Sequence, residues 1–379
     1  MPCERESMLS LSSLFFFTMK FTKIESSYMQ RAIDLAWKGY GKTQPNPLVG
    51  AVVVRDGVIV GEGFHKKYGS AHAEVNALKM AGSKAKGADL YVTLDPCRHT
   101  GKTGPCTEVV KKYGIKRVIS AIDDLHDLGH EGEKILKRAG VVFQRGLLSG
   151  AAQESQQFYR KNVRCELPYV ILKVATTMDG KIAAASGFSR GITSEESQIY
   201  VHAMRSRADA ILTGGGTIEM DDPHMGVRLI KGRSPLRVLL DSDLNVSLTS
   251  DFFRDDQVVV FTTDRAPSRT VLALRKLGIE VIVQDTLNDI PAILKVLFER
   301  GVRILMIEAG PRIMTSFVSQ GCVDEYVQIV APKLLGGVNS PTSLEGADVQ
   351  DYASIKTLQR LAVSHVGPDV LLSGYLQWY

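Results

Sequence analysis

Residues 72–106 read HAEVNALKMAGSKAKGADLYVTLDPCRHTGKTGPC. The stretch begins with His72 and contains two cysteines, Cys97 and Cys106, each of which directly follows a proline. One imidazole and two thiols are the set of protein ligands that a catalytic zinc takes while it keeps a fourth position open for water. Zinc lowers the pKa of that water to about 7, so hydroxide becomes available at neutral pH. The stretch therefore predicts one zinc ion per chain, bound by these three side chains.

Glu74 follows His72 by two residues, close to the predicted metal without needing to bind it. Zinc-dependent base deaminases keep a carboxylate at this point, where it moves protons between the water and the leaving ammonia. The pattern therefore predicts a hydrolytic deaminase with Glu74 as its catalytic residue. The signature usually ends in Cys-x-x-Cys, whereas eight residues separate Cys97 from Cys106 here. The alternative to a zinc site is that the two cysteines are unrelated and the histidine belongs to the core. A His-x-Glu motif, a strand over 88–94 and two Pro-Cys pairs in this order would, however, rarely occur together by chance.

Apolar periodicity predicts a helix over 71–80, which places His72 and Glu74 in its first turn. A later helix is predicted to open with Cys106. The positive end of the helix dipole stabilises a thiolate at such a position, as a metal ligand requires. Two helix starts are therefore expected to carry the zinc site.

The chain has 379 residues, which is too long for one compact core and suits two domains. An amphipathic helix is predicted over 149–163, and Leu167-Pro168 then breaks the pattern. We expect a disordered extension over 1–24, the zinc deaminase domain over 25–166 and a second domain over 167–379.

Hydrophobic residues make up 44% of the chain and charged residues 23%, as in ordinary globular proteins. The formal net charge is +5 and no long run of lysine and arginine occurs, so we expect no nucleic-acid partner. The five cysteines are scattered and odd in number, which favours a reducing cytoplasm over a disulfide framework. The apolar segment over 9–19 is too short to span a bilayer, so no membrane partner is expected. We further expect a homo-oligomer.

Strands and helices alternate through both halves, which predicts an α/β fold. A strand over 210–213 runs into Gly214-Gly215-Gly216, where backbone N–H groups can approach a phosphate, although such a run is more often a plain turn. A strand over 304–307 leads to Glu308-Ala309-Gly310, and Pro311 then starts a helix whose unsatisfied N–H groups form an anion site. No Gly-x-Gly-x-x-Gly fingerprint is found, so a Rossmann domain is not expected.

Several motifs resemble those of the bifunctional deaminase/reductase family of riboflavin biosynthesis. In the first half these are Pro45-Asn46-Pro47-Leu48-Val49-Gly50, His72-Ala73-Glu74, Thr93-Leu94-Asp95-Pro96-Cys97, His99-Thr100-Gly101-Lys102-Thr103 and Cys106. In the second half they are residues 172–181, 192–193, 211–228, 239–242, 308–311 and 331–336. The resemblance runs from about Tyr28 to the C-terminus. It implies a cytidine-deaminase-like three-layer domain followed by a dihydrofolate-reductase-like domain.

The resemblance also implies the reactions and the residues that carry them. The family deaminates the phosphorylated pyrimidine 2,5-diamino-6-(5-phosphoribosylamino)pyrimidin-4-one, and then reduces the ribosyl chain to ribityl with NADPH. By matching position, the residues expected to bind the cofactor are Ala175, Thr217, Asp221, Ser242 and Gly310. Those expected to bind the substrate are Ser189, Arg205, Asp221, Met225, Arg228 and Glu308. Arginine can pair bidentately with a sugar phosphate, and a buried carboxylate can orient or protonate the nitrogen of a ring-opened ribosylamine.

Three positions depart from the family pattern. Asp123-Asp124-Leu125-His126 stands where Asp-Pro-Asn-Pro is usual, Gly104 replaces a proline, and Gly191 replaces a tryptophan beside the cofactor. We expect altered substrate contacts in the deaminase loop and a lower affinity for nicotinamide. Two alternatives stay open: a nucleoside or nucleic-acid deaminase with an accessory domain, and a non-enzymatic protein whose structural zinc takes His99 as its fourth ligand.

Overall fold

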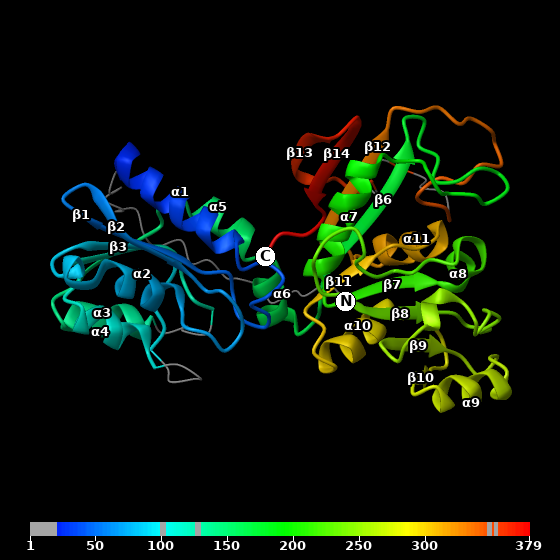
Figure 1. The fold of residues 1–379 in the computed structure, drawn as a ribbon, viewed down its shortest axis with the longest axis horizontal. Coiled ribbons are helices and arrows are strands. Elements are labelled where there is room, and N and C mark those ends of the chain that lie inside the picture. Colours follow the sequence, from blue (N-terminus) through cyan, green and yellow to red (C-terminus); the bar gives the residue numbers. More distant parts are fainter. Residues whose placement is uncertain (1–20, 99–103, 126–129, 347–350, 352–354) are drawn as a thin grey trace. The chain divides into compact units, whose positions relative to one another are not determined.

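The computed structural model describes residues 21–98, 104–125, 130–346, 351 and 355–379 (Figure 1). The chain forms two compact units: unit 1 is Met1–Cys165 together with Tyr379, and unit 2 is Glu166–Trp378. Each unit has its own sheet and its own hydrophobic core. Every helix in the described ranges is too short or too polar to cross a membrane.

Unit 1 is built on a five-stranded sheet with the order β2-β1-β3-β4-β5. Its strands are β1 (Gly50–Arg55), β2 (Val58–Phe64), β3 (Asp89–Leu94), β4 (Arg117–Ile122) and β5 (Val142–Arg145). Its helices are α1 (Lys23–Trp37), α2 (Ala73–Ala81), the short 3-10 helix η1 (Gly82–Ala85), α3 (Cys106–Lys112), α4 (Glu131–Arg138), α5 (Ser149–Ser155) and α6 (Gln157–Cys165). β1 pairs antiparallel with β2 and β3, whereas β3, β4 and β5 are parallel.

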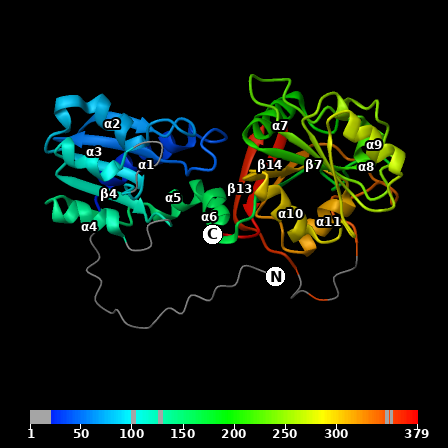
Figure 2. The same ribbon diagram turned by 90° about the horizontal axis from the view of Figure 1, so that it is seen from below.

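Helices cover both faces of this sheet (Figure 1 and Figure 2). One face packs against α2, α3 and α4 in a core that contains Leu78, Val110 and Leu136. The opposite face packs against α1 and α5, where Met29 and Ala152 are fully buried. Unit 1 therefore has three layers, as predicted for the N-terminal half.

Unit 2 is built on a nine-stranded sheet with the order β10-β9-β8-β7-β11-β6-β12-β14-β13. Its strands are β6 (Tyr169–Thr177), β7 (Ala210–Gly214), β8 (Leu236–Leu240), β9 (Val258–Thr262), β10 (Glu280–Val283), β11 (Ile304–Ile307), β12 (Glu325–Ala331), β13 (Gln359–Val366) and β14 (Asp369–Tyr375). Its helices are α7 (Glu195–Arg207), α8 (Gly215–Asp221), the 3-10 helix η2 (Asp251–Phe253), α9 (Ser268–Lys276), α10 (Ile290–Glu299) and α11 (Pro311–Ser319). In this order across the sheet, the first seven strands, β10 to β12, are all parallel to one another. β14 pairs antiparallel with β12, and β13 pairs antiparallel with β14 at the edge of the sheet.

The structure corrects two helix boundaries in unit 1. The single helix predicted over 149–163 is two helices, α5 and α6, which are separated by Gln156. The Gln156 side chain is buried and donates a hydrogen bond to the carbonyl of Leu48, so a tertiary contact marks the break. At the other end of the unit, α1 begins at Lys23, inside the extension expected over 1–24, because Thr22 and Glu25 form a capping box.

Two further corrections concern the site-bearing segments. The helix predicted over 71–80 begins at Ala73, so His72 is its N-cap and only Glu74 lies in the first turn. The run Gly214–Gly216 is more than a turn, because α8 starts within it. Strand β13 was not anticipated; it lies at the sheet edge and nearly all of its residues are exposed, so its sequence lacks the alternation of a half-buried strand.

Gly50 allows β1 and α1 to pack closely, and this contact can be tested. A Cβ added at Gly50 would lie 1.9 Å from the Ala32 carbonyl oxygen and 2.8 Å from the Ala36 nitrogen. Both are helix backbone atoms, so α1 would have to move off the sheet. We predict that Gly50→Ala destabilises the protein by about 2 kcal/mol or more, measured by thermal unfolding. Gly104→Ala is the control, since a Cβ there meets nothing within 4 Å; equal losses of stability in the two variants would contradict the prediction.

Candidate active sites

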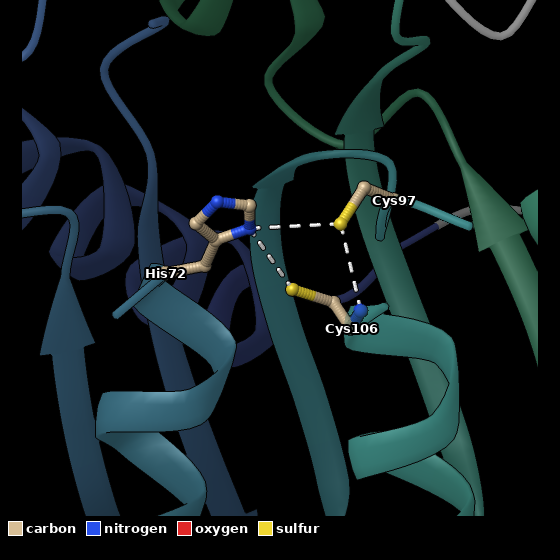
Figure 3. Close-up of side chains that lie close together, drawn as sticks. All are labelled: His72, Cys97 and Cys106. Carbon is tan, nitrogen blue, oxygen red and sulfur yellow. Dashed lines mark hydrogen bonds between the residues drawn. The ribbon is translucent and has the colours of Figure 1, made fainter. Parts of the chain in front are cut away.

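The three predicted zinc ligands lie together in unit 1 (Figure 3). The His72 Nδ1 atom is 3.2 Å from the Cys106 Sγ atom and 3.5 Å from the Cys97 Sγ atom. All three ligand atoms lie within 4.8 Å of one another. His72 caps α2, Cys97 follows β3 and Cys106 opens α3, so three separate elements supply the ligands.

Backbone hydrogen bonds bring the two cysteines together across the eight-residue insertion. The Asp95 N–H donates to the Ile122 carbonyl at 3.0 Å, which holds the turn after β3 against the end of β4. The Thr107 N–H then donates to the Cys97 carbonyl at 3.2 Å, which fixes the start of α3 beside that turn. The long spacing is therefore compatible with one site, because a hydrogen bond joins the residues on its two sides, Cys97 and Thr107.

The donor set fits zinc. Hydrogen bonds from Cys106 lower the pKa of the Cys97 thiol well below its usual value, and the Cys106 N–H donates to the Cys97 Sγ at 3.5 Å. An easily formed thiolate and an imidazole are good ligands for this ion. Within the described ranges the metal-binding group has three members, which leaves a fourth position open. His99, the candidate fourth ligand, lies outside those ranges.

Glu74 is placed where a proton-transfer residue is needed. It is only 3% exposed in the first turn of α2. Burial, and then the negative charge of the Cys97 thiolate, raise the pKa of Glu74 to about 7. A carboxyl group with such a pKa can both accept and release a proton near neutral pH.

The structure adds residues that we did not single out from the sequence. Arg145 on β5 donates to both carboxylate oxygens of the buried Asp95 at 3.1 Å, and thereby steadies the turn that carries Cys97. The His65 ring lies 5.4 Å from the His72 ring, and the Asn46 side chain is 3.1 Å from His65 Nε2. Asn46 and Asp95 lie in motifs that carry the family resemblance, whereas no sequence signal pointed to Arg145 or His65.

A second candidate site is a cavity of about 940 Å³ in unit 2. It lies at the ends of β6, β7 and β11 and is bordered by α8 and α11. Nine of the ten residues predicted for the cofactor or the substrate line it: Ala175, Ser189, Arg205, Thr217, Asp221, Met225, Arg228, Glu308 and Gly310. Ser242 is not among the lining residues; its carbonyl accepts hydrogen bonds from Thr262 at 3.3 Å and Thr263 at 2.9 Å.

Glu308 is the charged centre of this cavity. Arg205 donates to its two carboxylate oxygens at 2.7 and 3.0 Å, and Lys173 donates at 3.3 Å. Burial alone would raise the pKa of Glu308, but the charges of Arg205 and Lys173 lower it to about 2. The carboxylate is therefore ionised at any physiological pH. Lys173 received no role in the sequence analysis, although it lies within the segment 172–181 that carries the resemblance.

Two glycines leave room for a dinucleotide. A Cβ added at Gly310 would meet nothing closer than the Thr217 Oγ1 atom at 4.0 Å, and one added at Gly216 would meet nothing within 4 Å. At Gly214 and Gly215, by contrast, an added Cβ would lie 2.5 Å from Ile313 and 2.3 Å from Asp241. Close packing therefore explains why glycine is required at positions 214 and 215, but it does not explain the glycines at 216 and 310. Open space beside Gly310, the N-cap of α11, fits the close approach of phosphate oxygens to the backbone.

Family comparisons define the class of the protein. The family model for the cytidine and deoxycytidylate deaminase zinc-binding region matches residues 22–122, and the RibD C-terminal domain model matches residues 168–372. The chain thus joins a zinc-binding deaminase domain to a reductase domain, and the two matches fall in units 1 and 2, respectively.

Similar proteins of known family identify the group of enzymes within this class. The riboflavin biosynthesis protein RibD of Bacillus amyloliquefaciens is 42% identical over 355 residues, which cover 92% of this chain and 96% of the relative. That of Aquifex aeolicus is 38% identical over 92% of this chain and 98% of its own length. The crystal structure of Acinetobacter baumannii RibD in form 1 has a TM-score of 0.81 at 35% identity, with 93% of this chain and 99% of the other covered.

The chain therefore belongs to the RibD family, and it is a bifunctional deaminase and reductase of riboflavin biosynthesis. Membership confirms the fold class, the two enzyme classes and the cofactors, zinc and NADPH, that the resemblance implied. The alternatives of a nucleic-acid deaminase with an accessory domain and of a structural zinc protein are not supported, since whole relatives align over both units.

The zinc ligands can be tested by metal content. We predict that Cys97→Ser and Cys106→Ser each lose the zinc, because a serine hydroxyl is a harder and far less acidic donor than a thiol. Metal analysis of the purified proteins should find about one zinc per wild-type chain and almost none in either variant. Cys165→Ser and His99→Ala are the controls and should keep the metal. Loss of zinc from His99→Ala would show that the site has a fourth protein ligand.

Gly310 can be tested by cofactor affinity. A branched side chain would occupy the space beside the α11 N-terminus, so we predict that Gly310→Val weakens NADPH binding by roughly 10-fold or more. Fluorescence titration measures the affinity, and circular dichroism checks the fold, which should hold because Gly310 has room for a Cβ. Zinc content should stay unchanged. An unaltered affinity in the folded variant would place the cofactor elsewhere, along Gly214–Thr217.

Proposed function

We propose that unit 1 hydrolytically deaminates 2,5-diamino-6-(5-phosphoribosylamino)pyrimidin-4-one, and that unit 2 then reduces the ribosyl chain of the product to ribityl with NADPH. The observation that carries the proposal is the group His72, Cys97 and Cys106 with the buried Glu74 in one unit, together with the phosphate-compatible cavity in the other. The solved Thermotoga maritima protein, with a TM-score of 0.80 at 33% identity, is described as a diaminohydroxyphosphoribosylaminopyrimidine deaminase and 5-amino-6-(5-phosphoribosylamino)uracil reductase.

In the deaminase site the division of labour follows from the chemistry of the side chains. His72, Cys97 and Cys106 would hold the zinc, and the ion would act as a Lewis acid that makes water nucleophilic at neutral pH. Glu74 accepts the proton that the attacking water loses and delivers it to the amino nitrogen that leaves as ammonia. The net change replaces the C–NH₂ group of the pyrimidine by C=O.

In the reductase site NADPH would supply the hydride, and the side chains that line the cavity would orient the substrate toward it. Glu308 is an ionised carboxylate, so it orients the substrate by accepting hydrogen bonds and does not act as the acid. Both arms of the Arg205 fork are engaged by Glu308. Arg228 is exposed at the cavity, and no carboxylate pairs with its guanidinium within the described residues. We therefore assign the substrate phosphate to Arg228.

We also propose that the enzyme works as a homo-oligomer in the cytoplasm. Leu361 and Val363 on the edge strand β13 are 57% and 63% exposed, and an edge strand with apolar side chains favours contact with another chain. The five cysteines are scattered along the chain and odd in number, as is common in proteins of a reducing compartment. Light scattering after size-exclusion chromatography measures the assembly, and a monomer would contradict the first statement.

The Glu74→Gln variant tests the deaminase activity, in an assay that also follows the reductase activity. The amide keeps the shape of the carboxylate but cannot relay protons, so we predict that deamination falls by at least ~10²-fold while zinc content is retained. The protein is incubated with the phosphoribosylaminopyrimidine, with and without NADPH, and the products are followed by mass. Wild type should exchange NH for O with or without NADPH, because the NH₂ group leaves as ammonia and one hydrogen of the water stays on the product, and it should add two further hydrogens only when NADPH is present. A variant that deaminates at the normal rate would show that Glu74 is not the proton carrier.

A further inference from the structure

One wall of the cavity in unit 2 is an irregular loop, residues 222–228, that follows α8. Asp222 and Met225 have positive φ values of 38° and 52°, which is uncommon for residues other than glycine. The loop has no strand partner, so side-chain contacts from neighbouring elements must fix its shape. Arg228, which we assign to the substrate phosphate, is its last residue.

Helix α7 contacts the end of this loop through two side chains, His202 and Arg205. The His202 Nδ1 atom accepts a hydrogen bond from the Arg228 N–H at 2.9 Å. One turn later, Arg205 donates to the Gly226 carbonyl at 3.3 Å while it also pairs with Glu308. Residues three apart lie on one face of a helix, so a single face of α7 contacts both the loop and Glu308.

The chemistry of His202 suits an acceptor. The side chain is 5% exposed, and the groups that face it are Arg205, Arg228, Glu308 and His224. Burial, and then the charges of Arg205 and Arg228, lower the pKa of His202 to about 4. The ring is therefore neutral at physiological pH, and its Nδ1 atom can accept only if the ring proton sits on Nε2. A protonated ring could not make this bond.

We propose that His202 is a positioning residue of the reductase: by accepting the Arg228 N–H, it fixes the main chain from which the Arg228 guanidinium reaches into the cavity. The inference rests on the proposed assignment of the substrate phosphate to Arg228. It gives His202 a role in substrate affinity without any contact to substrate or cofactor. Within the described residues no carboxylate pairs with the Arg228 guanidinium, so the bond to His202 fixes the main chain and leaves the guanidinium able to bind a phosphate.

Neighbouring contacts hold other parts of the loop and supply a control. The Ser234 Oγ atom accepts from the Val227 N–H at 3.0 Å, one residue before Arg228. Arg254 donates to the His224 carbonyl at 2.6 Å, nearer the start of the loop. Ser234→Ala therefore removes a bond of the same kind from the same loop but leaves the Arg228 N–H bound to His202.

The test compares two amide substitutions at His202. Asparagine carries its oxygen near the position of the imidazole Nδ1 atom, whereas glutamine carries it near the position of Nε2. In steady-state assays of the full-length protein with the deaminated substrate, we expect His202→Gln to raise the KM for that substrate by about 10-fold, the scale of one lost hydrogen bond. We expect His202→Asn and Ser234→Ala to stay within about 3-fold of wild type. The kcat and the NADPH affinity should change little in all three variants.

The outcomes separate this inference from the assignment on which it rests. Arg228→Met should raise the KM for the phosphorylated substrate; if it does not, the phosphate assignment fails and the role of His202 fails with it. If Arg228→Met raises the KM but the two His202 amides behave alike, the acceptor at Nδ1 does not matter and only the positioning inference is overturned. Thermal unfolding checks each fold, and His202→Ala replaces His202→Gln if the latter does not fold. A raised KM in folded His202→Asn alone also overturns the inference.

Discussion

Parallel strands of one sheet all point the same way, so the segments that leave their carboxyl ends gather at one edge. Both sites depend on this constraint. In unit 1, β3 and β4 are parallel neighbours, and the turn after β3 that carries Cys97 is tied to the end of β4. In unit 2, β11 lies between β7 and β6, so Thr217, which follows β7, and Gly310, which follows β11, line one cavity.

Two buried glutamates show how the environment then assigns different roles to the same side chain. Burial and the charge of the Cys97 thiolate raise the pKa of Glu74 to about 7, which allows it to carry protons. Arg205 and Lys173 lower the pKa of Glu308 to about 2 against the effect of burial, which keeps it charged. The difference lies in the sign of the neighbouring charges, because desolvation acts in the same direction on both carboxyl groups.

Helix N-termini and glycines provide the backbone N–H groups and the space that an anion needs in order to bind. Cys106 opens α3 and Gly310 caps α11, so the free N–H groups and the positive dipole end of each helix face a thiolate or a predicted phosphate. Gly310 and Gly216 have room for a side chain within the protein, whereas Gly214 and Gly215 do not. The sequence shows four similar glycines, and only their surroundings distinguish a packing requirement from space left for a ligand.

The sequence by itself determined the zinc-type ligand set, the neighbouring glutamate, the alternation of strands and helices and the family resemblance, because these depend on residue type and short spacing. It did not give the break at Gln156, the edge strand β13 or the pairing of Lys173 with Glu308. Each of these is set by contacts between residues far apart in the chain. His202 and Arg228 meet across 26 positions. Such contacts follow from the order in which strands pair within a sheet, and only the tertiary structure decides that order, since local periodicity is the same for any order of neighbours.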